Sequence, residues 1–303
     1  MGVSDMKRFI INILVFFGVV AAVDVVAGKV FGYLQSNKAK GRTGVEYHVC
    51  KALNEDILIM GSSRALHHYV PQILEDSLGI SCFNGGQDGN GIVMQYGRWK
   101  MISENKVPKL IIYDIEPSFD MAENDNDRYI DRLKPFASDK SVRAYMASLF
   151  PMERLKLESS MYRYNYKFLE ILSDCVVSPT IQKGYIPLRG HIRPEMIDAK
   201  ADASKTTSEL DAVKLEYLEK FISEAQGLGC KVVLVSSPYW KGHMQTDFSV
   251  IEELAEKYSV TFLNYAESEL VENPDYFADS MHLNDDGANE FTKDLVTKLK
   301  AKI

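Results

Sequence analysis

Cysteine is scarce in this sequence of 303 residues. The four that occur are Cys50, Cys82, Cys175 and Cys230, and their spacing matches neither a zinc site nor a haem attachment site. We therefore expect no metal and no cofactor. The four residues can form two disulfides or remain four thiols, and the sequence leaves both alternatives open.

An excess of positive charge is also absent. The formal net charge is −7, which argues against a general nucleic-acid-binding protein. No internal repeat is visible. The hydrophobic content of 46% and charged content of 25% are those of an ordinary globular protein, and the length allows one large domain or two small ones.

Long hydrophobic runs are rare too, but one stands near the amino end. Lys7 and Arg8 precede an uncharged run of 15 residues, Phe9 to Val23, and Asp24 then interrupts it. Taken as one helix, Phe9 to Leu34 is long enough to span a bilayer. The favoured interpretation is a signal anchor with the rest of the chain outside the cytoplasm.

Two other interpretations of this segment stay open. A signal peptide could be cleaved near Val25-Val26-Ala27, or the segment could be a buried helix of a soluble protein. The favoured division of the chain is an anchor at 1–34, a polar linker at 35–45 and one α/β domain at 46–303.

Short apolar runs alternate with helical periodicity in the remainder, which predicts a mainly parallel sheet covered on both faces, a three-layer α/β/α sandwich. Strands are expected at 56–60, 80–83, 109–115, 231–237 and 260–265, and helices at 71–78, 91–105, 210–229, 248–259 and 284–303. The interval 118–209 breaks this rhythm. It predicts a largely helical insertion over the carboxyl edge of the sheet, where open α/β folds bind ligands.

Three distant segments are expected to meet at that edge. They are "GSSR" (61–64), "FNGGQDGNG" (83–91) and "YFADSMHLNDDG" (276–287). A serine hydroxyl becomes a good nucleophile when a histidine takes its proton, and a carboxylate can orient that histidine. Asp279 and His282 can supply both groups, and the glycines of the second segment can point N–H groups at an oxyanion.

These segments resemble the blocks of the SGNH/GDSL hydrolase superfamily, which has a flavodoxin-like fold. The Gly-Asp-Ser-Leu block aligns with Gly61-Ser62-Ser63-Arg64, and this implies Ser63 as the nucleophile. The Asn-x-Gly-x-x-Gly block aligns with residues 84–89 and implies an oxyanion hole of the Ser63 and Gly86 N–H groups. The Asp-x-x-His block aligns with residues 279–282.

The third block of the superfamily departs from this pattern. Its asparagine donates to the oxyanion, but Glu116 stands at that place. A carboxylate only accepts hydrogen bonds and would repel an oxyanion. Three alternatives follow: the hole uses backbone N–H groups alone, another side chain such as Asn90 substitutes, or activity is weak or absent.

One branch resembles the chain more closely. Membrane-anchored proteins that help O-acylate extracytoplasmic polysaccharides, including polysaccharide O-acetylation and D-alanyl-transfer proteins, often combine Gly-x-Ser-Arg with a short hydrophobic amino terminus. This resemblance implies an acylated glycan or another small acyl ester as substrate. It also implies a multi-spanning membrane acyltransferase as partner.

Plainer structural roles compete with these assignments. Ser63 can be a turn residue, and Asp279 and His282 a helix cap and a surface histidine, although Asn284 or Asp285 can cap the last helix instead. Arg64 can bind an anionic group or pair with Asp114 or Glu116. Adjacent histidines at 67 and 68 point apart on a helix, which favours packing over metal binding.

Three functions are therefore weighed. The favoured one is a serine esterase or O-acyltransferase on acylated extracytoplasmic carbohydrate, with Arg64, Asn90 and Glu116 as candidate substrate-binding residues. The second is a non-catalytic binding or assembly protein on the same fold, motivated by Glu116. A lipase is weaker, because the insertion begins with acidic residues instead of an apolar lid.

Overall fold

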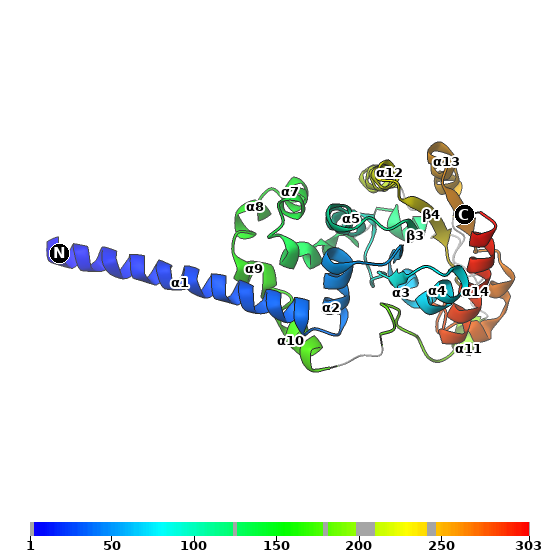
Figure 1. The fold of residues 1–303 in the computed structure, drawn as a ribbon, viewed down its shortest axis with the longest axis horizontal. Helices are drawn as coiled ribbons and strands as arrows, with labels where there is room; N and C mark the ends of the chain where they lie inside the picture. Colours follow the sequence, from blue (N-terminus) through cyan, green and yellow to red (C-terminus); the bar gives the residue numbers. More distant parts are fainter. Residues whose placement is uncertain (1–2, 124–125, 178–180, 198–209, 241–246, 303) are drawn as a thin grey trace. The chain divides into compact units, whose positions relative to one another are not determined.

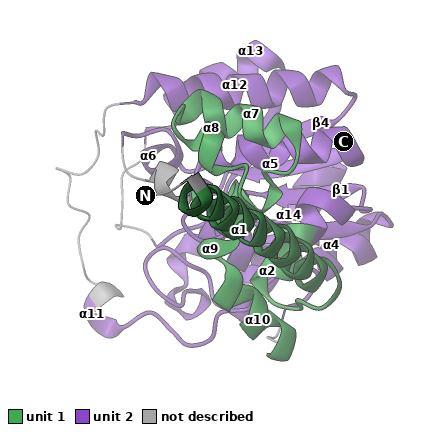
Figure 2. Ribbon diagram, turned by 90° about the vertical axis from the view of Figure 1, so that its left-hand side faces the viewer, with its two compact units in different colours: residues 1–47, 131–178 green, residues 48–130, 179–303 purple. Residues whose placement is uncertain are grey.

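A computed structural model describes residues 3–123, 126–177, 181–197, 210–240 and 247–302 (Figure 1). Contacts divide the chain into two compact units (Figure 2). Unit 1 comprises residues 1–47 and 131–178, and unit 2 comprises residues 48–130 and 179–303. Residues 198–209 of the predicted insertion lie outside the described residues.

Unit 2 contains a five-stranded sheet of order β2-β1-β3-β4-β5, with every neighbouring pair parallel. The strands are β1 (Ile57–Met60), β2 (Cys82–Asn84), β3 (Leu110–Asp114), β4 (Lys231–Ser236) and β5 (Thr261–Asn264). This is the flavodoxin-like strand order. It confirms the predicted fold class, and the predicted strand bounds differ from the observed ones by at most two residues at either end.

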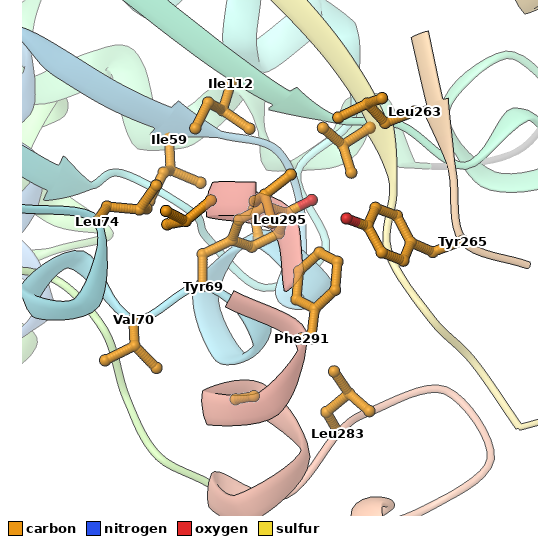
Figure 3. Close-up of a cluster of buried hydrophobic side chains, with 14 of the residues drawn as sticks. Ile59, Tyr69, Val70, Leu74, Ile112, Leu263, Tyr265, Leu283, Phe291 and Leu295 are labelled. Carbon is orange, nitrogen blue, oxygen red and sulfur yellow. The ribbon is translucent and has the colours of Figure 1, made fainter. Parts of the chain in front are cut away.

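The central strands are buried throughout, which explains their continuous apolar sequences. One face of the sheet is covered by α3 (Ser63–His68), α4 (Pro71–Leu78) and α14 (Asp285–Lys300). Figure 3 shows the core there: the ring of Phe291 meets those of Tyr69 and Tyr265 edge-on, at centroid distances of 5.0 and 4.8 Å.

The other face carries α5 (Ile92–Asn105) and α12 (Ala212–Gly227), with α13 (Ser249–Tyr258) beside α12 and β5. Phe221 joins the layers, because its ring lies 5.5 Å from both Trp99 of α5 and Tyr113 of β3. Short helical segments complete unit 2: η1 (His48–Ala52), α6 (Pro117–Asp120), α11 (Pro194–Ile197), η4 (Glu269–Glu272) and η5 (Pro274–Tyr276).

Local signals fix the helix ends. Pro71 begins α4, and Gly79 ends it in the left-handed conformation. Asp211 caps α12, and the Asn284 side chain caps α14 by accepting from the Gly287 N–H at 3.0 Å. The cap of α14 is thus Asn284, which leaves Asp279 and His282 for another role.

Part of the predicted insertion runs along the carboxyl edge of the sheet. Its backbone bonds to β2, to α3 and to the start of α14 through Asn84 N–Lys183 O, Ile186 N–Leu66 O and Asp285 N–Leu188 O, with distances of 2.9, 3.3 and 2.8 Å. We call residues 183–192 the edge segment. It links the end of β2, the serine helix and the start of the last helix.

Unit 1 is helical in its described residues. Its helices are α1 (Val3–Asn37), α2 (Arg42–Tyr47), α7 (Lys140–Leu149), α8 (Glu153–Lys156), α9 (Ser160–Asn165) and α10 (Phe168–Val176), with η2 (Asn126–Phe136) leading in from unit 2. Between α1 and α2 only residues 38–41 of the predicted linker are non-helical, and Lys40 N donates to Asp174 O of α10's last turn at 2.9 Å. The predicted division at residues 34 and 45 stays a prediction.

Gly61, between β1 and α3, has a φ of +138°, and a Cβ there would lie 2.7 Å from the Asp114 carbonyl oxygen. Gly61→Ala should lower the free energy of unfolding by roughly 1 to 3 kcal/mol, because the side chain is strained in this conformation. Urea denaturation measures the change. Gly227→Ala is the control, since nothing lies within 4 Å of its Cβ position. Equal stability of the two variants would contradict this account of the turn.

Candidate active site

Ser63 is the first residue of α3, directly after the sharp turn that follows β1. Two donors hold this turn by bonding to the Gly61 carbonyl oxygen: the Gln95 side chain at 2.7 Å and the Gln87 N–H at 3.1 Å. Ser62 is buried, with 6% of its surface exposed, whereas Ser63 is only partly buried. Of the two adjacent serines, Ser63 is therefore the one that a substrate can approach.

A chain of hydrogen bonds joins the serine to a histidine and a carboxylate. The Oγ of Ser63 lies 2.8 Å from Nε2 of His282, and Nδ1 of His282 lies 3.0 Å from both carboxylate oxygens of Asp279. These three residues come from the two ends of unit 2. The arrangement has the contacts of a serine–histidine–aspartate triad, in which the histidine can accept the serine proton.

A tight turn fixes the aspartate beside the histidine. Asp279 Oδ1 also accepts from the backbone N–H groups of Met281 and His282, at 2.8 and 2.9 Å. Burial alone would raise the pKa of Asp279, but the hydrogen bonds and charge of His282 and the two N–H donors hold this pKa below its ordinary value. The carboxylate is thus ionised at neutral pH and can stabilise a protonated His282.

His68 holds the histidine segment against the serine helix, a role that the sequence prediction missed. It is fully buried, its Nε2 accepts from the Leu283 N–H at 3.0 Å, and its Nδ1 bonds to Ser237 Oγ at 2.9 Å. Because Nε2 accepts, Nδ1 carries the proton. The pKa of His68 lies well below its ordinary value, mainly because the ring is buried and secondly because His282 is close. The ring therefore stays neutral.

His67 packs beside His282. Its Nδ1 lies 2.7 Å from the Ile186 carbonyl oxygen of the edge segment, and its Nε2 lies 3.3 Å from Asp88 Oδ1. Its ring centroid is 5.8 Å from that of His282. Within the described residues, no cluster of histidine, cysteine, aspartate and glutamate suits a metal ion, and Cys50, Cys82, Cys175 and Cys230 are free thiols.

Arg64 is part of the buried frame beneath the site. Its guanidinium is 2% exposed, donates to the carbonyl oxygens of Ser237 and Ile115 at 3.3 and 3.1 Å, and pairs with Asp114 at 3.4 Å. The carboxylate pairing considered from the sequence is therefore found with Asp114. Burial would lower the pKa of Arg64, but the carboxylates of Asp114 and Glu116 raise it overall.

Glu116 and Asp120 complete this buried charged cluster. Glu116 is 1% exposed and accepts a hydrogen bond from the Ser118 hydroxyl. Asp120 is equally buried, and its Oδ2 accepts from the Glu116 N–H at 2.9 Å. Burial, together with the charges of Glu116 and Asp114, raises the pKa of Asp120 to about 8. Asp120 is therefore protonated at neutral pH.

The backbone donors proposed for an oxyanion hole differ in their surroundings. The Ser63 N–H belongs to the first turn of α3, where N–H groups lack partners within the helix. The Gly86 N–H instead donates to Asn84 Oδ1 at 2.8 Å. An oxyanion would therefore share the Gly86 donor with a side chain. Gly86 is packed so closely on α3 that a Cβ would lie 2.2 Å from the Leu66 nitrogen.

Two asparagines of the second segment have structural contacts. Asn84 donates to the carbonyl oxygens of Ala65 and Tyr69, at 2.7 and 3.0 Å, and so joins β2 to the serine helix. Asn90 is fully buried and donates to Gln87 Oε1, while its Oδ1 has no hydrogen-bond partner. The proposed substrate contacts of Arg64, Asn90 and Glu116 stay predictions.

Asp120 makes stability depend on pH. Its pKa is higher in the folded than in the unfolded chain, so between about pH 4 and pH 8 the unfolded chain releases a proton that the folded chain keeps. Stability therefore falls as pH rises through this window. Asp120→Asn should weaken the fall by up to about 1.4 kcal/mol per pH unit, because an amide does not ionise.

Urea denaturation from pH 5 to pH 8 would measure this effect. Asp139→Asn, at the N-cap of α7, is a matched control that should leave the slope unchanged. Parallel pH profiles for wild type and Asp120→Asn would show that Asp120 is ionised in the folded chain.

No family model and no curated protein matches this chain. Solved structures that resemble it include a protein assigned to the lipolytic G-D-S-L family from Desulfitobacterium hafniense, at 10% identity over 81% of this chain and 99% of that one, with a TM-score of 0.40. A variant of an acetyl xylan esterase from Geobacillus stearothermophilus has 12% identity over 82% and 96% of the two chains, with a TM-score of 0.40. A protein assigned as an acylhydrolase from Bacteroides fragilis has 13% identity over 80% and 86%, with a TM-score of 0.38.

The chain's own strand order and site place its motif segments where the sequence resemblance requires. The serine segment follows β1, the glycine-rich segment follows β2, and the Asp-x-x-His segment precedes the last helix. The chain has the SGNH/GDSL hydrolase fold.

Proposed function

We propose that this protein is a serine esterase or O-acyltransferase that acts through an acyl-enzyme on acylated carbohydrate outside the cytoplasm. The observation that carries the proposal is the unbroken chain of hydrogen bonds from Ser63 through His282 to Asp279. Ser63 is partly exposed, whereas Gln87 and Gln95, which hold the turn before it, are buried. A structural turn serine would have no need of an oriented histidine.

The proposed acylation has two proton transfers at His282. Its Nε2 accepts the Ser63 hydroxyl proton as Oγ attacks the ester carbonyl carbon. The imidazolium then gives this proton to the leaving alcohol as the carbon–oxygen bond breaks, which yields the acyl-enzyme. In deacylation, water or a glycan hydroxyl attacks the acyl carbon and gives its proton to His282, which passes it to Ser63 Oγ as the bond from Oγ to the acyl carbon breaks. Water as acceptor gives hydrolysis, and a glycan hydroxyl gives transfer.

The oxyanion would be bound by backbone donors. The Ser63 N–H is the better placed of the proposed pair, since the Gly86 N–H is shared with Asn84. Glu116 offers no replacement for the missing asparagine, because its carboxylate is in the buried cluster with Arg64. Loss of one oxyanion donor typically lowers the rate about 100- to 1,000-fold, so we expect a slow enzyme on simple esters.

The glycan substrate and the membrane setting rest on the sequence resemblance to proteins that O-acylate extracytoplasmic polysaccharides. We extend the proposal to a multi-spanning membrane acyltransferase as partner. Contacts within unit 1 support a retained anchor over a cleaved signal peptide. The Asp24 carboxylate bonds to Ser159 Oγ and Ser160 N, at 2.6 and 2.8 Å, and Phe31 stacks on Tyr164 at 5.7 Å. Cleavage near Ala27 would remove the first of these contacts.

A non-catalytic binding or assembly protein is the second candidate. The observation that favours it is the oxyanion site, where a carboxylate replaces the expected amide and the Gly86 N–H is already engaged. If this candidate holds, Ser63→Ala keeps the biological role intact. Loss of that role in a folded Ser63→Ala protein excludes it.

A fluorophosphonate probe tests the nucleophile directly. In the full-length protein in detergent, the probe should add to Ser63, as read by peptide mass spectrometry. His282→Ala should abolish labelling, and Asp279→Asn should slow it by about 100-fold or more, because the histidine loses its orientation. Ser62→Ala is the matched control and should be labelled normally. A folded wild-type protein without label on Ser63 would refute the proposed chemistry.

His68 should affect this reactivity without touching the substrate. His68→Ala leaves the Leu283 N–H without its buried acceptor, so we expect labelling of Ser63 to slow about 10-fold or more. His68→Gln should restore part of the rate, because its amide oxygen can accept from the same N–H. His48→Gln, near Glu55, should leave the rate unchanged. Equal labelling rates in all three variants would remove His68 from the positioning role.

A further inference from the structure

Unit 1 exposes apolar side chains outside α1 as well as on it. On and beside α8, α9 and α10, these include Met152 (79% exposed), Leu155 (81%), Met161 (51%), Leu169 (67%) and Leu172 (43%). We call these five residues the apolar surface of unit 1. Among the described residues of unit 2, the exposed large apolar side chains are Leu210, Val213 and Leu228. Apolar exposure is thus concentrated in the unit that contains α1.

Contacts within unit 1 place the start of α9 and the start of α10 beside α1 between Asp24 and Phe31, whereas the last turn of α10 bonds to Lys40, beyond the end of α1. The Asp24 carboxylate accepts from the N–H groups of Ser160 and Met161 at the start of α9, both at 2.8 Å. The packing is close, because a Cβ on Gly28 would lie 2.4 Å from Ser160 Oγ. One turn further, Phe31 contacts the rings of Tyr164 and Phe168. The start of α9 is therefore level with Asp24, at the end of the uncharged run.

The length of that run sets where a bilayer must end. Phe9 to Val23 comprises 15 residues, and it is about 22 Å long at ~1.5 Å per residue. The hydrocarbon core of a typical bilayer is about 30 Å thick. If Lys7 and Arg8 lie at one interface, the other interface reaches Asp24 or beyond. The starts of α9 and α10, which contact α1 between Asp24 and Phe31, then lie at headgroup level, where exposed apolar side chains are favourable.

The two units also differ in net charge: the unit with the exposed apolar side chains is positive, and the other is negative. Unit 1 has 14 lysine and arginine residues against 9 aspartate and glutamate residues, a net charge of +5. Unit 2 has 21 against 33, a net charge of −12. The apolar surface is flanked by exposed basic side chains, among them Arg154 and Lys156 of α8 and Lys29 of α1. Anionic lipid headgroups attract such a unit and repel the acidic one.

From these observations we propose that the apolar surface of unit 1 lies on the membrane and contacts anionic lipid at headgroup depth. This proposal rests on the proposed anchor. α8, α9 and the start of α10 form a monotopic platform around the end of the membrane-spanning segment. A single spanning helix is thereby supplemented by a broad lipid contact, which limits tilting of unit 1 relative to the bilayer.

Fluorescence quenching in vesicles tests this proposal with the full-length protein. Single cysteines replace Leu155, Met161 and Leu169 in turn, in a Cys175→Ser background, and carry an environment-sensitive fluorophore. Vesicles contain phosphatidylcholine with or without phosphatidylglycerol, and a nitroxide on the headgroup is the lipid quencher. We expect several-fold quenching at all three positions, stronger with phosphatidylglycerol. Leu228→Cys, at an exposed position of unit 2, is the matched control and should not be quenched.

Three results would overturn the proposal. If aqueous iodide quenches the labels and the lipid nitroxide does not, the surface lies in water. Labels shielded from both quenchers would place another protein on it, either a second copy or a different partner. A label on Val15→Cys tests the anchor separately from the platform. If α1 spans the bilayer, a nitroxide on the lipid chains near the bilayer centre quenches this label. No quenching rejects the anchor and the platform together. The fluorophosphonate reaction of Ser63 is independent of all these outcomes.

Discussion

One hydrogen bond, from the Leu283 N–H to Nε2 of His68, holds the segment of His282 against the helix of Ser63. It joins positions 215 residues apart, one beside His282 and one on the serine helix. Both partners are buried, so water cannot replace the bond, and the acceptor must be an unprotonated ring nitrogen. The 2.8 Å approach of His282 to Ser63 depends on this fixed spacing.

The same histidine connects the site to the charged cluster below it. His68 bonds to Ser237, whose carbonyl oxygen accepts from Arg64, and Arg64 pairs with Asp114, which accepts from the Tyr69 hydroxyl. One guanidinium cannot neutralise every carboxyl group near it, and the raised pKa of Asp120 relieves the excess by keeping that group neutral. In this chain the residues at the position of the superfamily's third block belong to this buried charged cluster. The cluster explains how Glu116 is accommodated there.

The two units divide the physical tasks of the molecule. Unit 2 has the acidic charge, the sheet and Ser63, and its apolar side chains pack mainly in its own core. Unit 1 has the basic charge and the apolar exposure, and its helices α9 and α10 are organised around α1 through Asp24 and Phe31. An aspartate within an apolar helix thus has a structural reason: it binds the positive end of a second helix.

The sequence by itself determined the fold class, the strand and helix positions, and the identity of Ser63, Asp279 and His282 as the residues that come together. The fold class and the element positions follow from local periodicity, whereas the three site residues follow from the resemblance of short motifs beside strand ends to the SGNH/GDSL blocks. The tertiary structure alone decided the roles of His68, Arg64 and Asp24, and the grouping of residues 131–178 with the amino-terminal helix. Each of these depends on a partner more than 40 residues away. Periodicity reports which face of an element is buried, but it does not report which distant group a buried polar side chain meets.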